Sequence, residues 1–154
     1  MLHRTREPNA GLYSPPGGKL EQAEGESPLA CALRELEEEV GVAAAPGDLH
    51  LTGLISERGF DDGKHYLMFL YELTHPVTLA EQSFGEGRLE WHEPGALSGL
   101  SIPRTDREVI WPLFWRYRGS FFSAHIDCTG ASLTWRLEQP ASDAAASVGD
   151  PVRE

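Results

Sequence analysis

The chain has 154 residues and a formal net charge of -11, with 40% hydrophobic and 24% charged residues. This length predicts one globular domain with a single sizeable core. The acidic balance excludes binding of a nucleic-acid polymer through a basic face, so any phosphate chemistry would need bound cations. No apolar run approaches the ~18 residues of a membrane span, and the polar start, Met1 to Pro8, lacks the apolar stretch of a signal peptide. Two cysteines make no disulfide framework, so we expect a reducing, cytoplasmic setting.

The first 26 residues are rich in turn signals, and a well-marked helix follows them. Ser27 is a good N-cap, and Pro28 suits the first helical position. Gly41 stands where a left-handed C-terminal residue belongs. The pattern predicts a helix over residues 28–40, with apolar residues on one face. Those residues are Leu29, Leu33, Leu36 and Val40.

Strand signals come next. Residues 49–57 and 64–74 are strand-like and flank a turn at 59–63. The second of these segments is apolar on both faces, which predicts a central strand. A shorter strand is expected at 88–92.

The C-terminal half predicts a second helix and a hairpin. A capping-box sequence opens a helix over residues 105–118, which Pro112 should kink. Residues 121–138 indicate a hairpin, which completes a domain over 1–138. The Ala-, Ser- and Pro-rich residues 139–154 predict a disordered tail. Strands interspersed with two helices predict an α+β fold with a mixed sheet.

Acidic residues share one face of the first predicted helix. Glu35, Glu38 and Glu39 are three and four residues apart, opposite the apolar stripe. Like charges at these spacings destabilise an isolated helix by a few tenths of a kcal/mol per pair. A hard cation such as Mg²⁺ or Mn²⁺ reverses that effect because it prefers carboxylate oxygens. The alternative is a solvated acidic surface.

Other groups adjoin this acidic face. Arg34 precedes Glu38 by four residues and can orient it through charge-assisted hydrogen bonds. Glu26 lies just ahead of the helix, near its positive dipole end. The Gly17–Gly18 turn lets the backbone approach closely and offer a carbonyl as a further hard ligand.

The order of these residues resembles the box motif of the Nudix family. From Arg34 to Val42 the chain reads Arg-Glu-Leu-x-Glu-Glu-x-Gly-Val, with Glu26 seven intervening residues upstream and Gly-Gly before it. One departure is that seven residues, not five, separate Gly18 from Glu26. Gln22–Ala23 resembles a two-residue loop insertion, which loops tolerate.

The resemblance implies a hydrolase that cleaves nucleoside diphosphates linked to another group, using Mg²⁺ or Mn²⁺. It also implies the α/β/α sandwich of the Nudix fold, with a mixed sheet between helices. By position, Glu35 would ligate metal and help activate water, and Arg34 would hold the glutamates in place. The implied metal ligands are Glu26, Glu35, Glu38, Glu39 and the Gly17 carbonyl.

Members of the family often take a further base from a loop before a later strand. The candidates here are Glu81, Glu86 and Glu90. Glu86 lies five residues before Trp91, a spacing that resembles MutT-type members, so we favour Glu86.

The entry to the box, from Leu12 to Lys19, resembles that of MutT-type enzymes that hydrolyse 8-oxo-dGTP. Asp106 is a candidate for the purine edge, although assisting the helix N-terminus explains it equally well. Tyr13 could stack on a base or simply pack, and Arg4 could meet the phosphates or be surface charge. The substrate-binding candidates are Arg4, Tyr13, Ser14, Lys19 and Asp106. The preferred candidate substrate is an oxidised purine dNTP, and the alternative substrate is ADP-ribose or another nucleotide sugar. A further alternative is that the chain is a non-catalytic nucleotide-binding module.

Other expectations concern assembly and packing. Only Met1–His3 precedes the family-like segment, so we expect part of the N-terminal strand to be missing. An open sheet edge would then favour dimerisation, leaving a monomer or a homodimer. The expected partner is a small-molecule nucleotide, with no membrane and no nucleic-acid polymer. The six histidines show no metal-ligand spacing, and the core is expected to include Trp111, Trp115 and Trp135.

Overall fold

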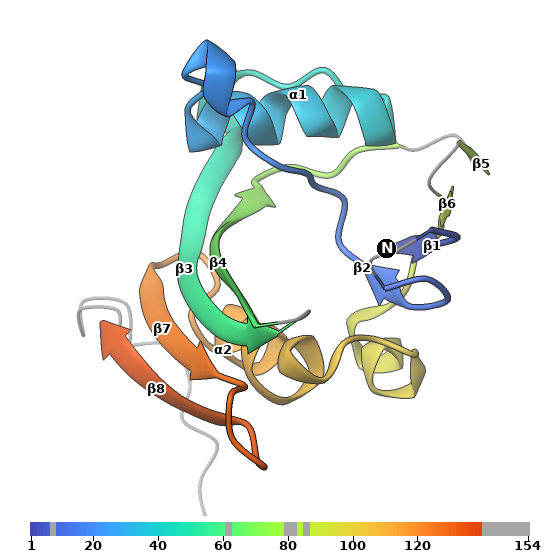
Figure 1. Ribbon diagram of the computed structural model, residues 1–154. Helices are drawn as coiled ribbons and strands as arrows, with labels where there is room; N and C mark the ends of the chain where they lie inside the picture. Colours follow the sequence, from blue (N-terminus) through green and yellow to red (C-terminus); the bar gives the residue numbers. More distant parts are fainter. Residues whose placement is uncertain (7–8, 61–62, 79–82, 85–86, 140–154) are drawn as a thin grey trace, which may run out of the picture. The chain divides into compact units, whose positions relative to one another are not determined.

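The computed structural model describes residues 1–6, 9–60, 63–78, 83–84 and 87–139 (Figure 1). The chain divides into two compact units. One unit comprises Met1–His50 with Tyr71–Ile110, and the other comprises Leu51–Leu70 with Trp111–Glu154.

The first unit contains a four-stranded antiparallel sheet in the order β2-β1-β6-β5. Its strands are β1 (Leu2–Arg4), β2 (Tyr13–Ser14), β5 (Ser83–Phe84) and β6 (Gly87–Leu89). Although β1 has only three residues, it pairs on both sides, so the open edge expected at the N-terminal strand is not found there. The Met1 ammonium extends the pairing by donating to the Glu90 carbonyl at 2.7 Å.

Helix α1 (Pro28–Val40) has the predicted bounds. The Ser27 hydroxyl accepts from the Ala30 N–H at 3.1 Å, which satisfies one of the free amides of the first turn. Gly41 ends the helix at φ 71°, in the left-handed region that glycine enters without strain. Both cap predictions are therefore confirmed.

A small apolar core joins α1 to this sheet. Leu2 of β1 is fully buried, and Leu89 of β6 and Val40 of α1 are each 5% exposed. Leu36 and Val42 pack against them. Burial of one helix stripe fixes which way the helix is turned, and this positions the acidic residues on the rest of its surface.

The second sheet has the order β4-β3-β7-β8. Its strands are β3 (Leu49–Phe60), β4 (Lys64–Leu73), β7 (Phe122–Asp127) and β8 (Thr134–Gln139). Because β3 and β7 run parallel whereas β7 and β8 are antiparallel, the sheet is mixed, as predicted. The predicted C-terminal hairpin is the β7–β8 pair.

Two strand predictions were wrong in detail. β4 lies at an edge of the described sheet, not at its centre, and none of its residues is fully buried. Apolar residues on both faces were therefore a poor guide to its position. β3 continues past Glu57 to Phe60, because Arg58 still pairs with Asp127 in the ladder.

The second helical segment is interrupted. A π-helical turn (Asp106–Ile110) leads into the short helix α2 (Trp111–Arg116). Pro112 has no N–H to donate one turn back, and the irregular turn ends two residues before it.

Tryptophan packing differs from expectation. Trp115 is 38% exposed and Trp135 is 47% exposed, so neither is a core residue. Trp115 stacks on Trp111 with ring centroids 5.9 Å apart. Among the described residues, no helix has the length and apolar character needed to cross a bilayer. β8 reaches Gln139, one residue into the predicted tail, whose remainder, 140–154, lies outside the described residues.

Candidate active site

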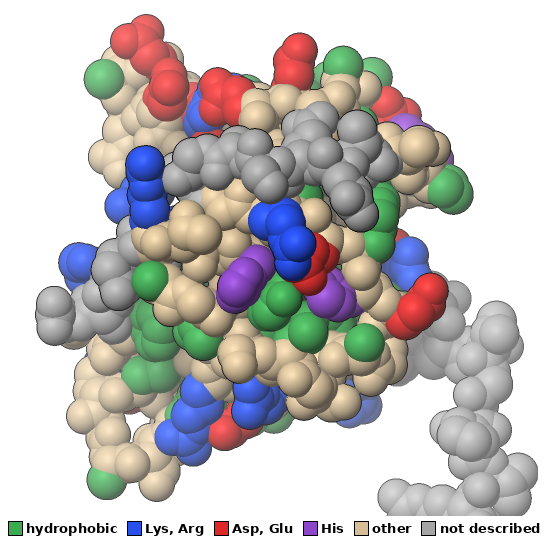
Figure 2. Space-filling model, turned by 90° about the vertical axis from the view of Figure 1, so that its right-hand side faces the viewer, with side chains coloured by type: hydrophobic (Ala, Val, Ile, Leu, Met, Phe, Trp, Pro, Cys, Tyr) green, Lys and Arg blue, Asp and Glu red, His purple; other side chains and the backbone are tan. Residues whose placement is uncertain are grey.

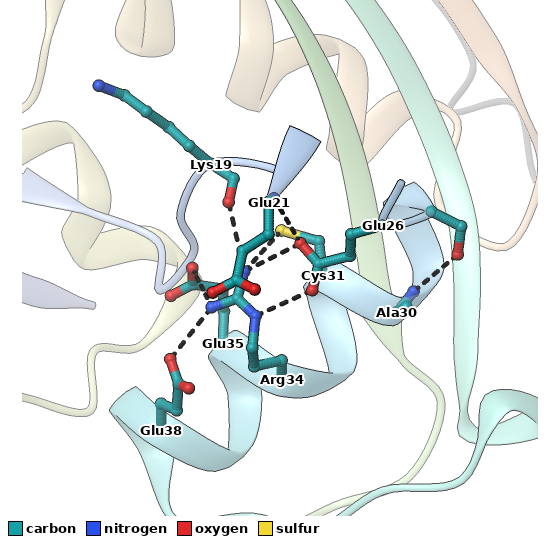
Figure 3. Close-up of polar contacts among 9 residues, drawn as sticks. Lys19, Glu21, Glu26, Ala30, Cys31, Arg34, Glu35 and Glu38 are labelled. Atoms are coloured by element: carbon teal, nitrogen blue, oxygen red, sulfur yellow. Dashed lines mark hydrogen bonds and ion pairs between the residues drawn. The ribbon is translucent and has the colours of Figure 1, made fainter. Parts of the chain in front are cut away.

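One guanidinium group organises the acidic end of the first unit. Arg34 donates through Nε and Nη2 to the two carboxylate oxygens of Glu26, at 2.9 and 3.1 Å. Its Nη1 donates to Glu35 at 2.8 Å and to Glu38 at 3.1 Å. Figure 3 shows these carboxylates converging on Arg34 from the helix and from the segment that precedes it. We call Glu26, Arg34, Glu35 and Glu38 the Arg34 cluster.

The backbone around the cluster reinforces this arrangement. The Glu21 N–H donates to Glu26 at 2.9 Å, and the Lys19 carbonyl accepts from Arg34 at 3.2 Å. The hydrogen bonds from Arg34 lower the pKa of Glu26 to about 2, and the Glu21 amide acts in the same direction. In turn the carboxylates raise the pKa of Arg34. Three carboxylates share one cationic group, so the cluster retains excess negative charge.

Glu39 lies on the inner side of the helix. It is 7% exposed, and it accepts from the Gly17 N–H at 2.7 Å. The amide hydrogen of Gly17 therefore contacts the box helix here, whereas the sequence predicts a role for its carbonyl. Gly18 lies so close to Glu35 that a Cβ atom would overlap its carboxylate. The Gly17–Gly18 turn thus brings backbone directly against two of the predicted metal ligands.

The chemistry of these donors suits a hard divalent ion. Glu35, Glu38 and Glu39 offer carboxylate oxygens, the ligands that Mg²⁺ and Mn²⁺ prefer. Their side chains range from largely buried to 60% exposed at Glu38, so one side of the set is open to water. Within the described ranges no three His, Cys, Asp or Glu side chains are arranged as a complete metal site. The carboxylates of the cluster are turned toward Arg34 instead.

A second group of polar side chains surrounds Tyr13. The Tyr13 hydroxyl donates to Glu90 at 3.1 Å, and its ring stacks on His3 at 4.5 Å and meets His92 edge-on at 5.1 Å. Glu90 also accepts from Arg88. Burial, followed by the hydrogen bond to Glu90, raises the pKa of Tyr13. Figure 2 shows a face of the molecule on which histidine side chains lie beside a basic and an acidic side chain.

The other predicted site residues have different surroundings. The Ser14 hydroxyl is buried and has no hydrogen-bond partner among the described residues. Lys19 joins the Arg34 cluster through its carbonyl, while its side chain extends away from it (Figure 3). Arg4 makes backbone hydrogen bonds to Gly11 and Leu12. Asp106 begins the π-helical turn.

Two of the three candidate bases, Glu81 and Glu86, lie outside the described residues. The third, Glu90, anchors Tyr13 and the chain start, a role that the sequence reasoning missed. It also missed Glu57 of β3, which is 3% exposed and accepts from the Cys128 thiol at 3.8 Å. The alternation of β3 could have revealed Glu57, since it shares the inward face with Ile55.

Comparison with known proteins gives the same assignment. The sequence model of the NUDIX domain matches residues 1–111. Among solved structures, a mutator MutT protein from Bacillus halodurans is similar, with a TM-score of 0.67 and 28% sequence identity. The match covers 89% of this chain and 87% of that one. Enzymes of this family act on small-molecule nucleotides and generally depend on divalent metal ions. The chain belongs to the Nudix family and is a hydrolase of the MutT type.

Proposed function

We propose that the chain hydrolyses the pyrophosphate bond of a nucleoside triphosphate or nucleoside diphosphate derivative in the cytoplasm. The candidate substrate that we favour is an oxidised purine dNTP, 8-oxo-dGTP, whose hydrolysis would yield the monophosphate and pyrophosphate. The observation that carries this proposal is the Arg34 cluster, in which one guanidinium gathers the carboxylates of Glu26, Glu35 and Glu38.

Glu35, Glu38 and Glu39 would hold Mg²⁺ or Mn²⁺, with Glu26 as an accessory ligand. When bound, the ion neutralises phosphate oxygens and lowers the pKa of a water molecule. The contact between Glu39 and the Gly17 N–H supports this assignment because it fixes one ligand against the turn. The Gly17 carbonyl, on the same turn, is a further candidate ligand.

Arg34 acts as a positioning residue, because its fork binds both oxygens of Glu26 and limits the rotamers of Glu35 and Glu38. Glu35 would accept a proton from the attacking water, since an ionised carboxylate can serve as a general base. Glu86 is a further candidate base, and its assignment rests on the sequence resemblance.

Substrate contacts are assigned to the segment that enters the box. The buried, unpartnered hydroxyl of Ser14 supports a polar contact with a ligand. The exposed side chain of Lys19 is suited to the phosphates, as is Arg4. Tyr13 already stacks on His3, so we assign it to one wall of the base site. Asp106 is the candidate for hydrogen bonds to the purine edge.

A panel of nucleotides with product analysis tests the proposal. With Mg²⁺, 8-oxo-dGTP should be the best substrate and release pyrophosphate. Glu38→Gln should lower turnover by at least 100-fold, whereas Glu37→Gln, on the same helix but outside the cluster, should leave it unchanged. A preference for ADP-ribose with release of a sugar phosphate would contradict the substrate assignment, and no turnover of any nucleotide would contradict the catalytic one.

A further inference from the structure

A serine of β3 is held between histidines from its two neighbouring strands. The hydroxyl oxygen of Ser56 lies 2.9 Å from Nε2 of His65 on β4 and 3.0 Å from Nδ1 of His125 on β7. β3 lies between β4 and β7 in the sheet, so the two imidazoles come from the strands on either side of Ser56. All three residues belong to the second unit. The histidines are far apart in sequence, so no spacing pattern could have shown that they meet.

The Ser56 hydroxyl bridges the two ring nitrogens. It carries one proton, so Ser56 can donate to only one of the two rings, and the other ring must donate to the serine oxygen. Neutral imidazole nitrogens are preferred ligands of Zn²⁺ and related transition metals, at bond lengths of about 2.0–2.1 Å. Two such nitrogens directed at one point are therefore suited to a metal ion.

Distances and exposure are relevant to whether a metal ion can replace the Ser56 hydroxyl as the partner of the two rings. The two nitrogens cannot be farther apart than the sum of their distances to Ser56, and Zn²⁺ holds two imidazole nitrogens roughly 3–4 Å apart. His65 is exposed, so its side chain has room to change rotamer, whereas His125 is half-buried. Beside His125 is a cavity of about 180 Å³, which leaves space for coordinated water. Its lining residues are His125, Asp127, Thr134, Trp135 and Arg136.

The local charge does not oppose a cation. Arg58 is paired with Asp127 at 2.6 Å, and Arg136 is paired with Glu138 at 2.6 Å. The charges of Arg58 and Arg136 are thus compensated, within a chain of net charge -11.

We propose that His65 and His125 form a binding site for a divalent transition-metal ion of the Zn²⁺ type, with water as the remaining ligands. The ion would replace the two hydrogen bonds to Ser56 and tie β4 to β7 across β3. The site would not take Mg²⁺, which prefers oxygen ligands, so it differs in chemistry from the carboxylates of the Arg34 cluster. Because the site has only two protein ligands, loss of either histidine should weaken metal binding.

The test is calorimetric titration of the untagged full chain with Zn²⁺, with Mg²⁺ in large excess so that it competes with Zn²⁺ for the carboxylates. His65→Ala and His125→Ala should each weaken binding at least tenfold and abolish a Zn²⁺-dependent rise in Tm. Ser56→Ala should bind at least as tightly as the parent chain because it removes the competing hydroxyl. His75→Ala is the control, since that histidine is exposed and faces Asp48 instead.

Parent-like Zn²⁺ binding by either histidine variant would overturn the paired site. If a variant fails to fold, NMR of the parent chain decides. Stoichiometric Zn²⁺ should shift the ring resonances of both His65 and His125, and unmoved resonances for either one would contradict the proposal.

Discussion

Arg34 binds both carboxylate oxygens of Glu26 through its guanidinium group, at 2.9 and 3.1 Å, although Glu26 is eight positions earlier in the sequence and precedes the helix. The same guanidinium reaches Glu35 and Glu38 with its remaining nitrogen. One side chain thereby sets the positions of three carboxylates that would otherwise repel one another.

Arg34→Lys should preserve the charge but lose the fork that binds both oxygens of Glu26. We expect kcat/KM to fall by about 10- to 100-fold, the range seen when residues supporting metal ligands are removed. The affinity for Mn²⁺ should fall in parallel, since the carboxylates lose their alignment. Arg136→Lys, in an exposed pair with Glu138, should match the parent chain in both measurements. Parent-like Mn²⁺ affinity in Arg34→Lys would show that Arg34 does not position the ligands.

Gly18→Ala tests the close approach of the turn to the helix. A Cβ at this position would overlap the Glu35 carboxylate, so Glu35 or the turn must shift. We expect turnover to fall at least tenfold with little loss of secondary structure by circular dichroism. Gly47→Ala is the matched control, because a Cβ there meets nothing within 4 Å. Equal turnover in the two variants would mean that the contact has no part in catalysis.

Ser27→Ala removes the cap of α1. The Ala30 amide then loses its side-chain acceptor at 3.1 Å. We expect the free energy of unfolding to fall by about 1 kcal/mol, the usual cost of an N-cap serine. Urea denaturation measures it, and Ser27→Asp should restore most of the loss because aspartate also caps. A loss of equal size in both variants would rule out capping as the cause.

Glu90 makes a pH-dependent contribution to the free energy of unfolding. Its burial raises the pKa, but the hydrogen bonds from Arg88 and Tyr13 outweigh this and leave the pKa below its ordinary value of 4.5. The ionised form therefore favours folding fully above pH 4.5, and this contribution is lost as the pH falls toward the folded-state pKa. Tyr13→Phe should raise the pKa of Glu90 and shift acid unfolding to higher pH. Carboxyl-carbon NMR titration measures the pKa, and an unchanged value would show that the Tyr13 hydroxyl bond is not significant.

The sequence was most informative where local chemistry decides the outcome. Helix α1 depended on a serine cap, a proline and a glycine terminator, so its bounds could be read directly. The edge position of β4 could not be read in this way, because partner choice in a sheet depends on residues such as Phe122 that lie far along the chain. The same limit applies to Glu90 and Tyr13, which meet only once β1, β2 and β6 pair.

The box carboxylates were predictable because spacing on one helix fixes their mutual positions. Glu39 was assigned to the same face, but its burial at 7% exposure depends on packing that periodicity does not describe. The contact of Glu39 with the Gly17 amide likewise depends on the path of the preceding loop, where the chain differs in length from the family motif.

The most direct test of the account is Mn²⁺ binding measured by electron paramagnetic resonance on the full chain. Glu35→Gln, Glu38→Gln and Glu39→Gln should each weaken Mn²⁺ binding at least tenfold, while Glu37→Gln, which is exposed on the same helix, should bind like the parent chain. Parent-like Mn²⁺ affinity in the Glu35, Glu38 and Glu39 variants alike would contradict the claim that these carboxylates hold the ion together.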